Sequence, residues 1–268
     1  RGEPDCVPVY PGLSTLYPLK NTGRPFWEIE YYDDPSKVDV MIDLVRELGY
    51  DGWFSGGLGV SPDDPECSSE VIEQSDAALT VRQTLRTSAG ELTQETVYPR
   101  SDSRWLRNGW ADGVDIEANA ELLCCQFVDP WQRSTAEYEE TYAKVGGLGI
   151  VELYTLTPFD WWAEYMRRSA QDAIFDFFDH PEVMRDLIAA YTDYTVEYVR
   201  AGCDRLKPDM VQFQGTSSSM SILSPDMFRE INLPYIERAA AVCREYDIPT
   251  YVHSGGKSVE MVKLLADS

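Results

Sequence analysis

Apolar and polar positions along the chain alternate between a strand-like and a helix-like period. Short apolar runs bounded by turn residues predict buried strands, and these runs are 6–10, 51–57, 149–155, 209–214 and 249–254. Apolar residues at helical spacing predict helices over 36–48, 135–145, 158–178, 181–201, 225–246 and 258–268. Strands separated by helices of this length indicate a parallel sheet, and the number of units favours a TIM (β/α)8 barrel over a doubly wound sheet.

Single residues mark several boundaries within this pattern. Thr157 is the expected N-cap of the helix from Pro158, and Gly202 is the expected stop of the helix from Pro181. Pro234 interrupts the helix over 225–246, so we expect a kink there, or a restart with Asn232 as the cap.

The stretch 78–100 departs from the α/β pattern. It has period-two alternation on both sides of Ser88-Ala89-Gly90, which predicts a β-hairpin inserted into the barrel. A hairpin of this kind is expected to form a lid over the barrel or an edge between subunits, which leaves a homodimer open.

The barrel predicted from these units is incomplete. We count about six strand–helix units, and no strand follows the last helix. We therefore expect one barrel domain over residues 1–268 that is incomplete at its C-terminal end, which leaves open whether the natural chain continues past Ser268.

Charge and composition restrict the partners. The net charge of −23 at pH 7 argues against nucleic acid and against an anionic membrane surface, because the long-range field repels both. No apolar run reaches the length of a membrane span, and the first residues lack a signal-peptide core. The six cysteines are scattered, with no Cys-x-x-Cys pair, as in reduced cytosolic proteins. We expect a soluble, cytoplasmic protein that acts on a small molecule.

Candidate site residues lie at or just past the predicted strand ends. His253 ends a strand and precedes a Gly-rich turn that includes Lys257, and in β/α barrels this edge carries the chemistry. Glu152 and Asp160 are candidates for a general acid–base pair with His253 as a third catalytic group. The candidate substrate-binding residues are Tyr10, Trp53, Phe54, Tyr154, Gln212, Gln214 and Lys257. These aromatic and amide side chains suit a neutral, partly apolar ligand.

Two alternatives remain open next to these residues. At least one of Trp161 and Trp162 is expected to belong to the core rather than to the site. The serine-rich stretch after Gln214, residues 215–219, is either a hydrogen-bonding loop or a flexible linker.

Three motifs in the last third of the chain resemble a known family. They are Ser224-Pro225-x-x-Phe228, then Leu233-Pro234-Tyr235, then His253-Ser254-Gly255-Gly256 at a strand end. Together they resemble the uroporphyrinogen decarboxylase superfamily, which includes uroporphyrinogen decarboxylases and the methylcobalamin:coenzyme M methyltransferases. The resemblance runs from about Pro4 to the end and is strong only from Phe159 onward.

The resemblance to the methyltransferases implies methyl transfer between a corrinoid on a partner protein and a thiol activated by zinc. In those enzymes a His-x-Cys pair and a later cysteine hold the zinc. Here His253 matches the histidine, but Gly255 stands at the cysteine position. A stable zinc site is therefore not favoured, although His253 stays the candidate ligand and Glu152 a possible second one.

The resemblance to the decarboxylases implies metal-free chemistry, with N-terminal arginines that hold carboxylates and an aspartate that binds pyrrole NH groups. This chain offers only Arg24 in the N-terminal loop, and Gly56 stands where the aspartate is expected. A corrinoid-linked methyltransferase is therefore the favoured function. The alternatives are a metal-free decarboxylase and a non-catalytic ligand-binding barrel.

Overall fold

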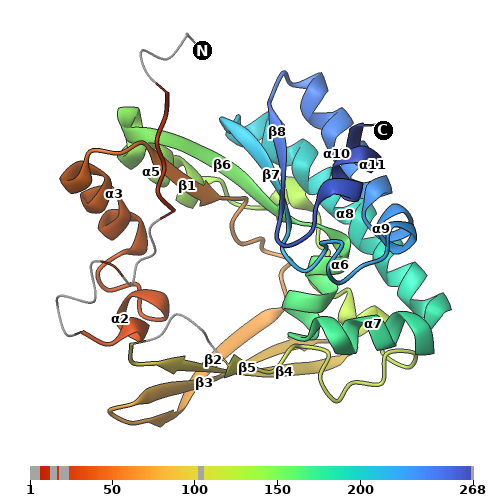
Figure 1. The fold of residues 1–268 in the computed structure, drawn as a ribbon. Helices are drawn as coiled ribbons and strands as arrows, with labels where there is room; N and C mark the ends of the chain where they lie inside the picture. The colour runs from red at the N-terminus through yellow and green to blue at the C-terminus, as the bar shows by residue number, and fades with distance from the viewer. Residues whose placement is uncertain (1–6, 13–16, 18–23, 102–105, 267–268) are drawn as a thin grey trace.

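Two sheets organise the computed structural model, which describes residues 7–12, 17, 24–101 and 106–266 (Figure 1). The parallel sheet has the strand order β1-β6-β7-β8 and the antiparallel sheet the order β2-β3-β4-β5. The strands are β1 (Gly52–Gly56), β2 (Glu66–Gln74), β3 (Ala78–Thr87), β4 (Gly90–Pro99), β5 (Leu106–Arg107), β6 (Gly149–Leu156), β7 (Met210–Gly215) and β8 (Thr250–Ser254).

Helices occupy most of the remaining chain. The α-helices are α2 (Phe26–Glu30), α3 (Lys37–Leu48), α4 (Ala120–Leu123), α5 (Ala136–Val145), α6 (Pro158–Asp160), α7 (Ala170–Asp179), α8 (Pro181–Leu206), α9 (Pro225–Ile231), α10 (Leu233–Glu245) and α11 (Val259–Ala266). Two 3₁₀ turns, η1 (Pro130–Gln132) and η2 (Gly146–Leu148), and one π-helix, η3 (Trp161–Met166), complete the set. Within the described residues, none of the helices combines the length and the apolar character that crossing a membrane requires.

The parallel sheet confirms the predicted α/β pattern. Its four strands, β1, β6, β7 and β8, each pair in parallel with the next one in this order. Helices α8 and α10 pack together beside the sheet (Figure 1). This arrangement is TIM-like. Among the described residues the parallel sheet has four strands and does not close into a barrel.

The strand predicted at 6–10 is wrong for the residues that the structure describes. Val7 is 83% and Val9 61% exposed, and no strand forms there. Two hydrogen bonds tie Val9 to Asp51: Val9 N donates to the side-chain Oδ2 of Asp51 at 2.7 Å, and Asp51 N donates to Val9 O at 2.9 Å. Pro8 lacks the backbone N–H that pairing with a neighbouring strand requires. The two valines beside it are therefore not enough to make this segment a strand. Cys6 lies outside the described residues.

Alternation along the parallel strands gives the sheet two different faces. One face is apolar and packs under the helices, and it carries Phe54, Val151, Leu153, Val211 and Phe213. The other face, which we call the polar face, carries Trp53, Ser55, Glu152, Tyr154, Gln212, Gln214, Tyr251 and His253. Because side chains alternate with period two, the register that buries Leu153 places Glu152 and Tyr154 together on the polar face.

The predicted hairpin over 78–100 is confirmed, as β3 and β4 pair antiparallel from Ala78 opposite Pro99 to Thr87 opposite Gly90. It belongs to a larger unit than expected, because β2 pairs with β3 and β5 with β4. Leu79 and Val81 form a small core with Trp27 of α2. In Figure 1 this sheet lies apart from the parallel sheet, on the side to which β8 runs.

The single helix predicted over 158–178 is divided. The π-helix η3 follows α6 directly, and the chain then turns through Arg168 at φ 56° before α7 begins. Ser169 caps α7, with its Oγ accepting a bond from Asp172 N at 3.2 Å. Neither proline nor glycine marks this break. The restart at Asn232 is confirmed, because α9 ends at Ile231 and α10 starts at Leu233.

Helix α8 continues through Gly202, where the sequence predicts its end, because this glycine permits close packing on the sheet. A Cβ added at Gly202 would lie 2.6 Å from Cδ2 of Leu153. We expect Gly202→Val to lower the free energy of unfolding by about 1–3 kcal/mol through overpacking. Urea denaturation measures this, with Ala189→Val on the exposed side of the same helix as the control. Equal losses in the two variants would contradict the assignment of the cost to packing on Leu153, because Gly→Val by itself favours the helix and Ala→Val does not.

Candidate functional site

Glu152 is the centre of the polar face. It lies in the middle of β6 and is 1% exposed. Its Oε1 accepts a hydrogen bond from Ser55 Oγ at 2.7 Å. Its Oε2 accepts bonds from Trp53 Nε1 at 2.8 Å and from Tyr251 Oη at 3.0 Å. One buried carboxylate therefore connects β1, β6 and β8.

Burial and hydrogen bonding act in opposite directions on this carboxyl group. Burial raises the pKa of Glu152, while the bonds from Ser55, Trp53 and Tyr251 and the nearby His253 lower it. None of the ion pairs among the described residues joins Glu152 to a lysine or an arginine. The negative charge of Glu152 is therefore held by neutral donors.

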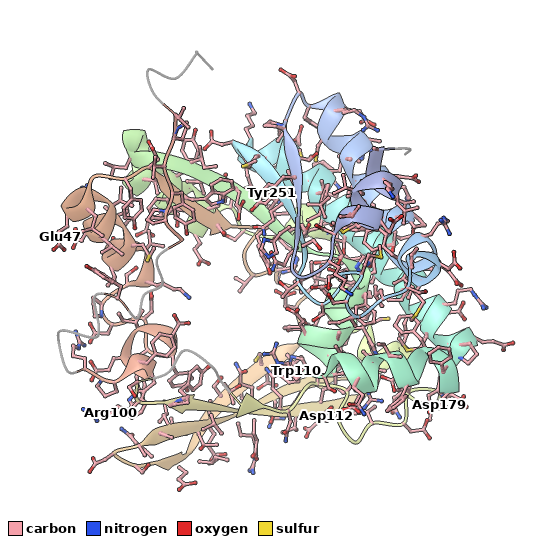
Figure 2. The ribbon with its side chains drawn as sticks, viewed as in Figure 1. Glu47, Arg100, Trp110, Asp112, Asp179 and Tyr251 are labelled. Carbon is pink, nitrogen blue, oxygen red and sulfur yellow. The ribbon has the colours of Figure 1, made fainter. Side chains whose placement is uncertain are left out.

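Three aromatic rings surround the carboxylate. The Trp53 ring lies 5.5 Å from the Tyr251 ring at an interplanar angle of 83°, and 5.9 Å from the Tyr10 ring at 34°. Tyr10 is 42% exposed, so the cluster has an open side. In Figure 2, Tyr251 lies on the side of β8 away from α10.

The carboxyl ends of β6, β7 and β8 add polar groups beside these rings. Register places Tyr154 opposite Gln212, and Gln214 opposite His253. Gln212 Nε2 donates to Gln214 Oε1, and Gln214 Nε2 donates to Thr216 Oγ1. Tyr154 is 38% exposed, and His253 is exposed as well. The predicted residues Glu152, Tyr154, Gln212, Gln214 and His253 therefore share one face of the sheet.

Asp160 is buried and belongs to a separate network. Its Oδ2 accepts bonds from Thr157 Oγ1 at 3.1 Å and from Ser218 Oγ, and its Oδ1 accepts one from Ser217 N at 2.9 Å. Ser217 Oγ also donates to Glu164 at 2.7 Å. Asp160 of α6 and Glu164 of η3 thus hold the serine-rich loop after β7 in place. Of the two alternatives for residues 215–219, this favours a hydrogen-bonding loop over a flexible linker. No bond joins Asp160 to Glu152, so their pairing as acid and base stays a prediction.

The pH dependence of stability tests the burial of Asp160. Burial raises its pKa to about 7, above the value near 4 of an unfolded aspartate. The protonated form therefore favours the folded state. This contribution is fully present below about pH 4 and is lost as the pH rises through about 7.

We therefore expect the free energy of unfolding of the wild type, relative to Asp160→Asn, to fall between about pH 4 and pH 8. Urea denaturation of both proteins across that range measures the difference. A difference that is constant or rises with pH would contradict the assigned burial of the charge.

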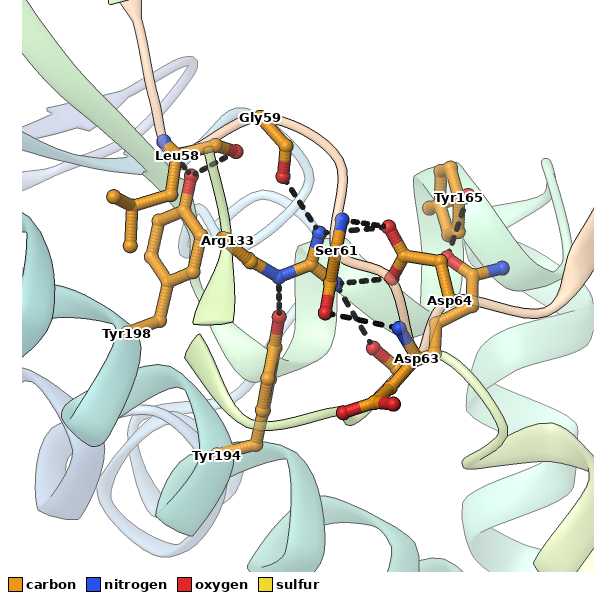
Figure 3. Close-up of polar contacts among 10 residues, drawn as sticks. Leu58, Gly59, Ser61, Asp63, Asp64, Arg133, Tyr165, Tyr194 and Tyr198 are labelled. Carbon is orange, nitrogen blue, oxygen red and sulfur yellow. Dashed lines mark hydrogen bonds and ion pairs between the residues drawn. The ribbon is translucent and has the colours of Figure 1, made fainter. Parts of the chain in front are cut away.

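A third network holds the loop that follows β1. Arg133 pairs with Asp64 at 2.8 Å, donates through Nη1 to Gly59 O at 2.9 Å, and donates through Nε to Tyr194 Oη at 3.1 Å (Figure 3). Tyr198 Oη accepts a bond from Leu58 N at 2.8 Å, and burial raises the pKa of Tyr198 to about 12. Helix α8 thus fixes this loop, and all of the Arg133 guanidinium is used in doing so.

Besides Asp160, two predicted site residues, Phe54 and Lys257, do not join the polar face. Phe54 lies in the apolar core opposite Val151, because it alternates with Trp53 and Ser55. The Lys257 side chain is exposed, and its backbone N bonds Ser221 Oγ at 3.1 Å. Trp161 and Trp162 are both buried in the core, as expected of at least one of them.

Sequence reasoning missed two residues of the site, Ser55 and Tyr251. Both donate to Glu152. The signal was present, because Ser55 is two residues from Trp53 and Tyr251 two residues from His253, which puts each pair on one face of a strand. Their bonds to β6 depend on strand order, which the sequence alone does not specify.

The described residues do not fit the zinc site implied by the methyltransferases. They include no group of three or more His, Cys, Asp or Glu side chains arranged to hold a metal ion. At Gly255, an added Cβ would lie 3.3 Å from Thr216 O, so a cysteine there requires the neighbouring loop to give way.

Comparison with known proteins bears on the whole fold and on its C-terminal part. The chain is similar in structure to a methyltransferase from Methanosarcina mazei, with a TM-score of 0.51 and 16% sequence identity, over 98% of this chain and 69% of that one. No match was found among the curated proteins compared by sequence. The profile of the family Uroporphyrinogen decarboxylase (URO-D) matches residues 155–268. The predicted resemblance to the uroporphyrinogen decarboxylase superfamily is therefore confirmed, with its sequence pattern carried by the segment from β6 to α11.

Proposed function

We propose that this chain is an enzyme of the uroporphyrinogen decarboxylase type that catalyses corrinoid-linked methyl transfer. The observation that carries the proposal is the polar face, where Tyr154, Gln214 and His253 lie toward the carboxyl ends of the parallel strands and Glu152 lies beside them in the middle of β6. In TIM-like folds this edge holds the active site. The structural similarity to a methyltransferase supports the fold on which the proposal depends.

The chain's own residues divide the work of such a reaction. Tyr154 and His253 are exposed on this face near the strand ends, so they are suited to bind and orient the substrate. The imidazole of His253 can also take up or release the proton of the accepting group. Glu152 is too buried to touch a substrate and instead fixes the orientation of Trp53 and Tyr251. A corrinoid on a partner protein would be the other reactant, which either gives the methyl group to the bound substrate or takes it from it.

The decarboxylase alternative has less support at this site. An added Cβ at Gly56, where the resemblance implies an aspartate, would lie 2.9 Å from Cδ2 of Tyr138. Arg24 pairs with Glu28 and donates to Asp34 O at 2.9 Å. Arg133 is committed to Asp64 and Gly59. A metal-free decarboxylase needs cationic groups free for a carboxylate.

The proposal is tested by incubating the protein with methylcobalamin and a simple thiol and following loss of the methylcobalamin absorbance. We expect catalysed demethylation by the wild type and a loss of about 10²-fold or more in His253→Ala. His253→Gln, which keeps a hydrogen-bonding side chain, separates proton transfer from orientation. Carbon dioxide release from an added carboxylic acid without demethylation would instead identify a decarboxylase. If neither reaction is observed, the chain is the non-catalytic ligand-binding barrel.

Metal content of the purified, unchelated protein decides the question of zinc separately. Near-stoichiometric zinc in the wild type that disappears in His253→Ala would show a thiol-activating site with further ligands still to be found. Zinc-free protein in both cases would leave His253 as a proton donor or hydrogen-bonding group.

A further inference from the structure

The aromatic rings of the polar face form a corner with an open side. Trp53 and Tyr251 stand nearly perpendicular, at 83° and 5.5 Å between ring centroids. Tyr10 extends the Trp53 side, at 5.9 Å. Rings set at an angle to each other present two electron-rich faces to one small group, which is how proteins hold quaternary ammonium ions.

Hydrogen bonding to Glu152 makes these faces more negative. The indole N–H of Trp53 and the hydroxyl of Tyr251 both donate to the same carboxylate oxygen, Oε2. A donor group that gives its hydrogen bond to an anion gains electron density, because the bond polarises it. The charge reaches the whole cluster, since Glu152 also contributes to the raised pKa of Tyr10 and of Tyr251.

The surrounding charges have the same sign. Tyr154, the exposed ring next to the corner, experiences Glu164, Asp160 and Glu152, and each of these carboxylates raises its pKa further. The buried carboxylate has no lysine or arginine partner among the ion pairs of the described residues. A positive ligand at the corner would offset the cost of burying Glu152, and a neutral ligand would not.

We infer that the corner of Trp53, Tyr251 and Tyr10 binds a small methylated ammonium cation. A quaternary nitrogen has no lone pair to accept a methyl group, so as a substrate this cation would be the methyl donor: its N–CH3 bond would break, the methyl group would pass to the reduced corrinoid of a partner protein, and the tertiary amine would leave. The role of the cation as a substrate rests on the proposed function, whereas its binding rests on the rings and on the carboxylate of Glu152. The N-methyl groups contact the ring faces, and the carboxylate of Glu152 acts through the rings without touching the ligand.

A paired titration tests this inference. The probes are choline and its neutral carbon analogue 3,3-dimethyl-1-butanol, which have the same shape and differ in charge. Tryptophan fluorescence and calorimetry measure binding to the full chain, without methylcobalamin. We expect choline to bind at least about tenfold more tightly than the neutral analogue, with an affinity that falls as salt is added.

Three variants locate the binding. We expect Trp53→Leu to weaken choline binding by about tenfold or more, and Glu152→Gln by about threefold or more, because the glutamine keeps hydrogen-bonding capacity but removes the charge. Tyr10→Leu shows whether weaker choline binding comes from the lost ring and not from misfolding, because the Tyr10 side chain is 42% exposed and its replacement disturbs the core little. Trp131→Leu, at a 40% exposed tryptophan on η1, is the matched control and leaves binding unchanged.

Equal affinity for the two probes, or choline binding that survives all three corner variants, overturns the inference. Methylcobalamin demethylation by a thiol in that same protein would then leave the proposed function standing without a cationic substrate. Choline binding that depends on the corner, in a protein inactive toward methylcobalamin, supports the inference while the proposed reaction fails.

Discussion

Glu152→Leu is expected to lower the free energy of unfolding by about 2–4 kcal/mol and to abolish activity at the polar face. The substitution leaves the three donors on Trp53, Ser55 and Tyr251 without their acceptor. An unpaired donor costs about 1–3 kcal/mol where it is fully buried, and less here, because Trp53 and Tyr251 are half-buried and Ser55 is exposed. The total stays below the sum, because removing a buried charge recovers part of its desolvation cost. Urea denaturation and tryptophan fluorescence measure the loss and the release of Trp53.

Glu152→Gln is the matched control for this prediction. The amide keeps one acceptor oxygen and the side-chain shape, so we expect a loss of no more than about 1.5 kcal/mol. If Glu152→Leu were as stable as the wild type, the carboxylate would not be the element that joins β1, β6 and β8, and the assigned geometry of the site would be wrong.

Asp176→Leu is expected to have the second large effect, about 3–5 kcal/mol of lost stability. Asp176 is buried on α7. It accepts bonds from Arg167 Nε and Nη2, both at 2.7 Å, and from Trp162 Nε1 at 2.8 Å. Its removal leaves a half-buried guanidinium and a buried indole N–H without their partner. The loss also loosens η3, which carries Glu164 and follows Asp160.

The surface pair of Asp193 and Arg238 provides the comparison. Its N–O distance is 2.8 Å, and the Asp193 side chain is 71% exposed. We expect Asp193→Leu to change stability by less than about 1 kcal/mol, since exposed ion pairs contribute little. Similar losses in the two variants, measured by urea denaturation, would show that burial of Asp176 is not what makes its pair important.

The polar face was largely predictable because alternation is a local signal. In β6 and β7 the residues Glu152, Tyr154, Gln212 and Gln214 alternate with valine, leucine and phenylalanine, so one register satisfies both strands. The same rule excludes Phe54, which the prediction grouped with its neighbour Trp53 by position at a strand end. Strand alternation, applied throughout, would have replaced Phe54 with Ser55.

Features that depend on distant contacts were not predictable. The strand β2 is exposed along most of its length, so its sequence lacks the apolar alternation of a half-buried strand, and pairing with β3 defines it. The end of the helix before Arg168 also has no glycine or proline signal. Gly202 has the signal of a helix end, but its contact with Leu153 explains the glycine instead.

Turnover of Tyr154→Phe, compared with Tyr142→Phe, tests most directly whether the polar face is the site of methyl transfer. Tyr154 is 38% exposed on the polar face, whereas Tyr142 is 45% exposed on α5. Both changes remove one hydroxyl from an exposed tyrosine, and methylcobalamin demethylation by a thiol is the measurement. We predict that Tyr154→Phe loses at least about tenfold in rate while Tyr142→Phe matches the wild type. Full activity in Tyr154→Phe, or an equal loss in both variants, would contradict the assignment of this face as the active site.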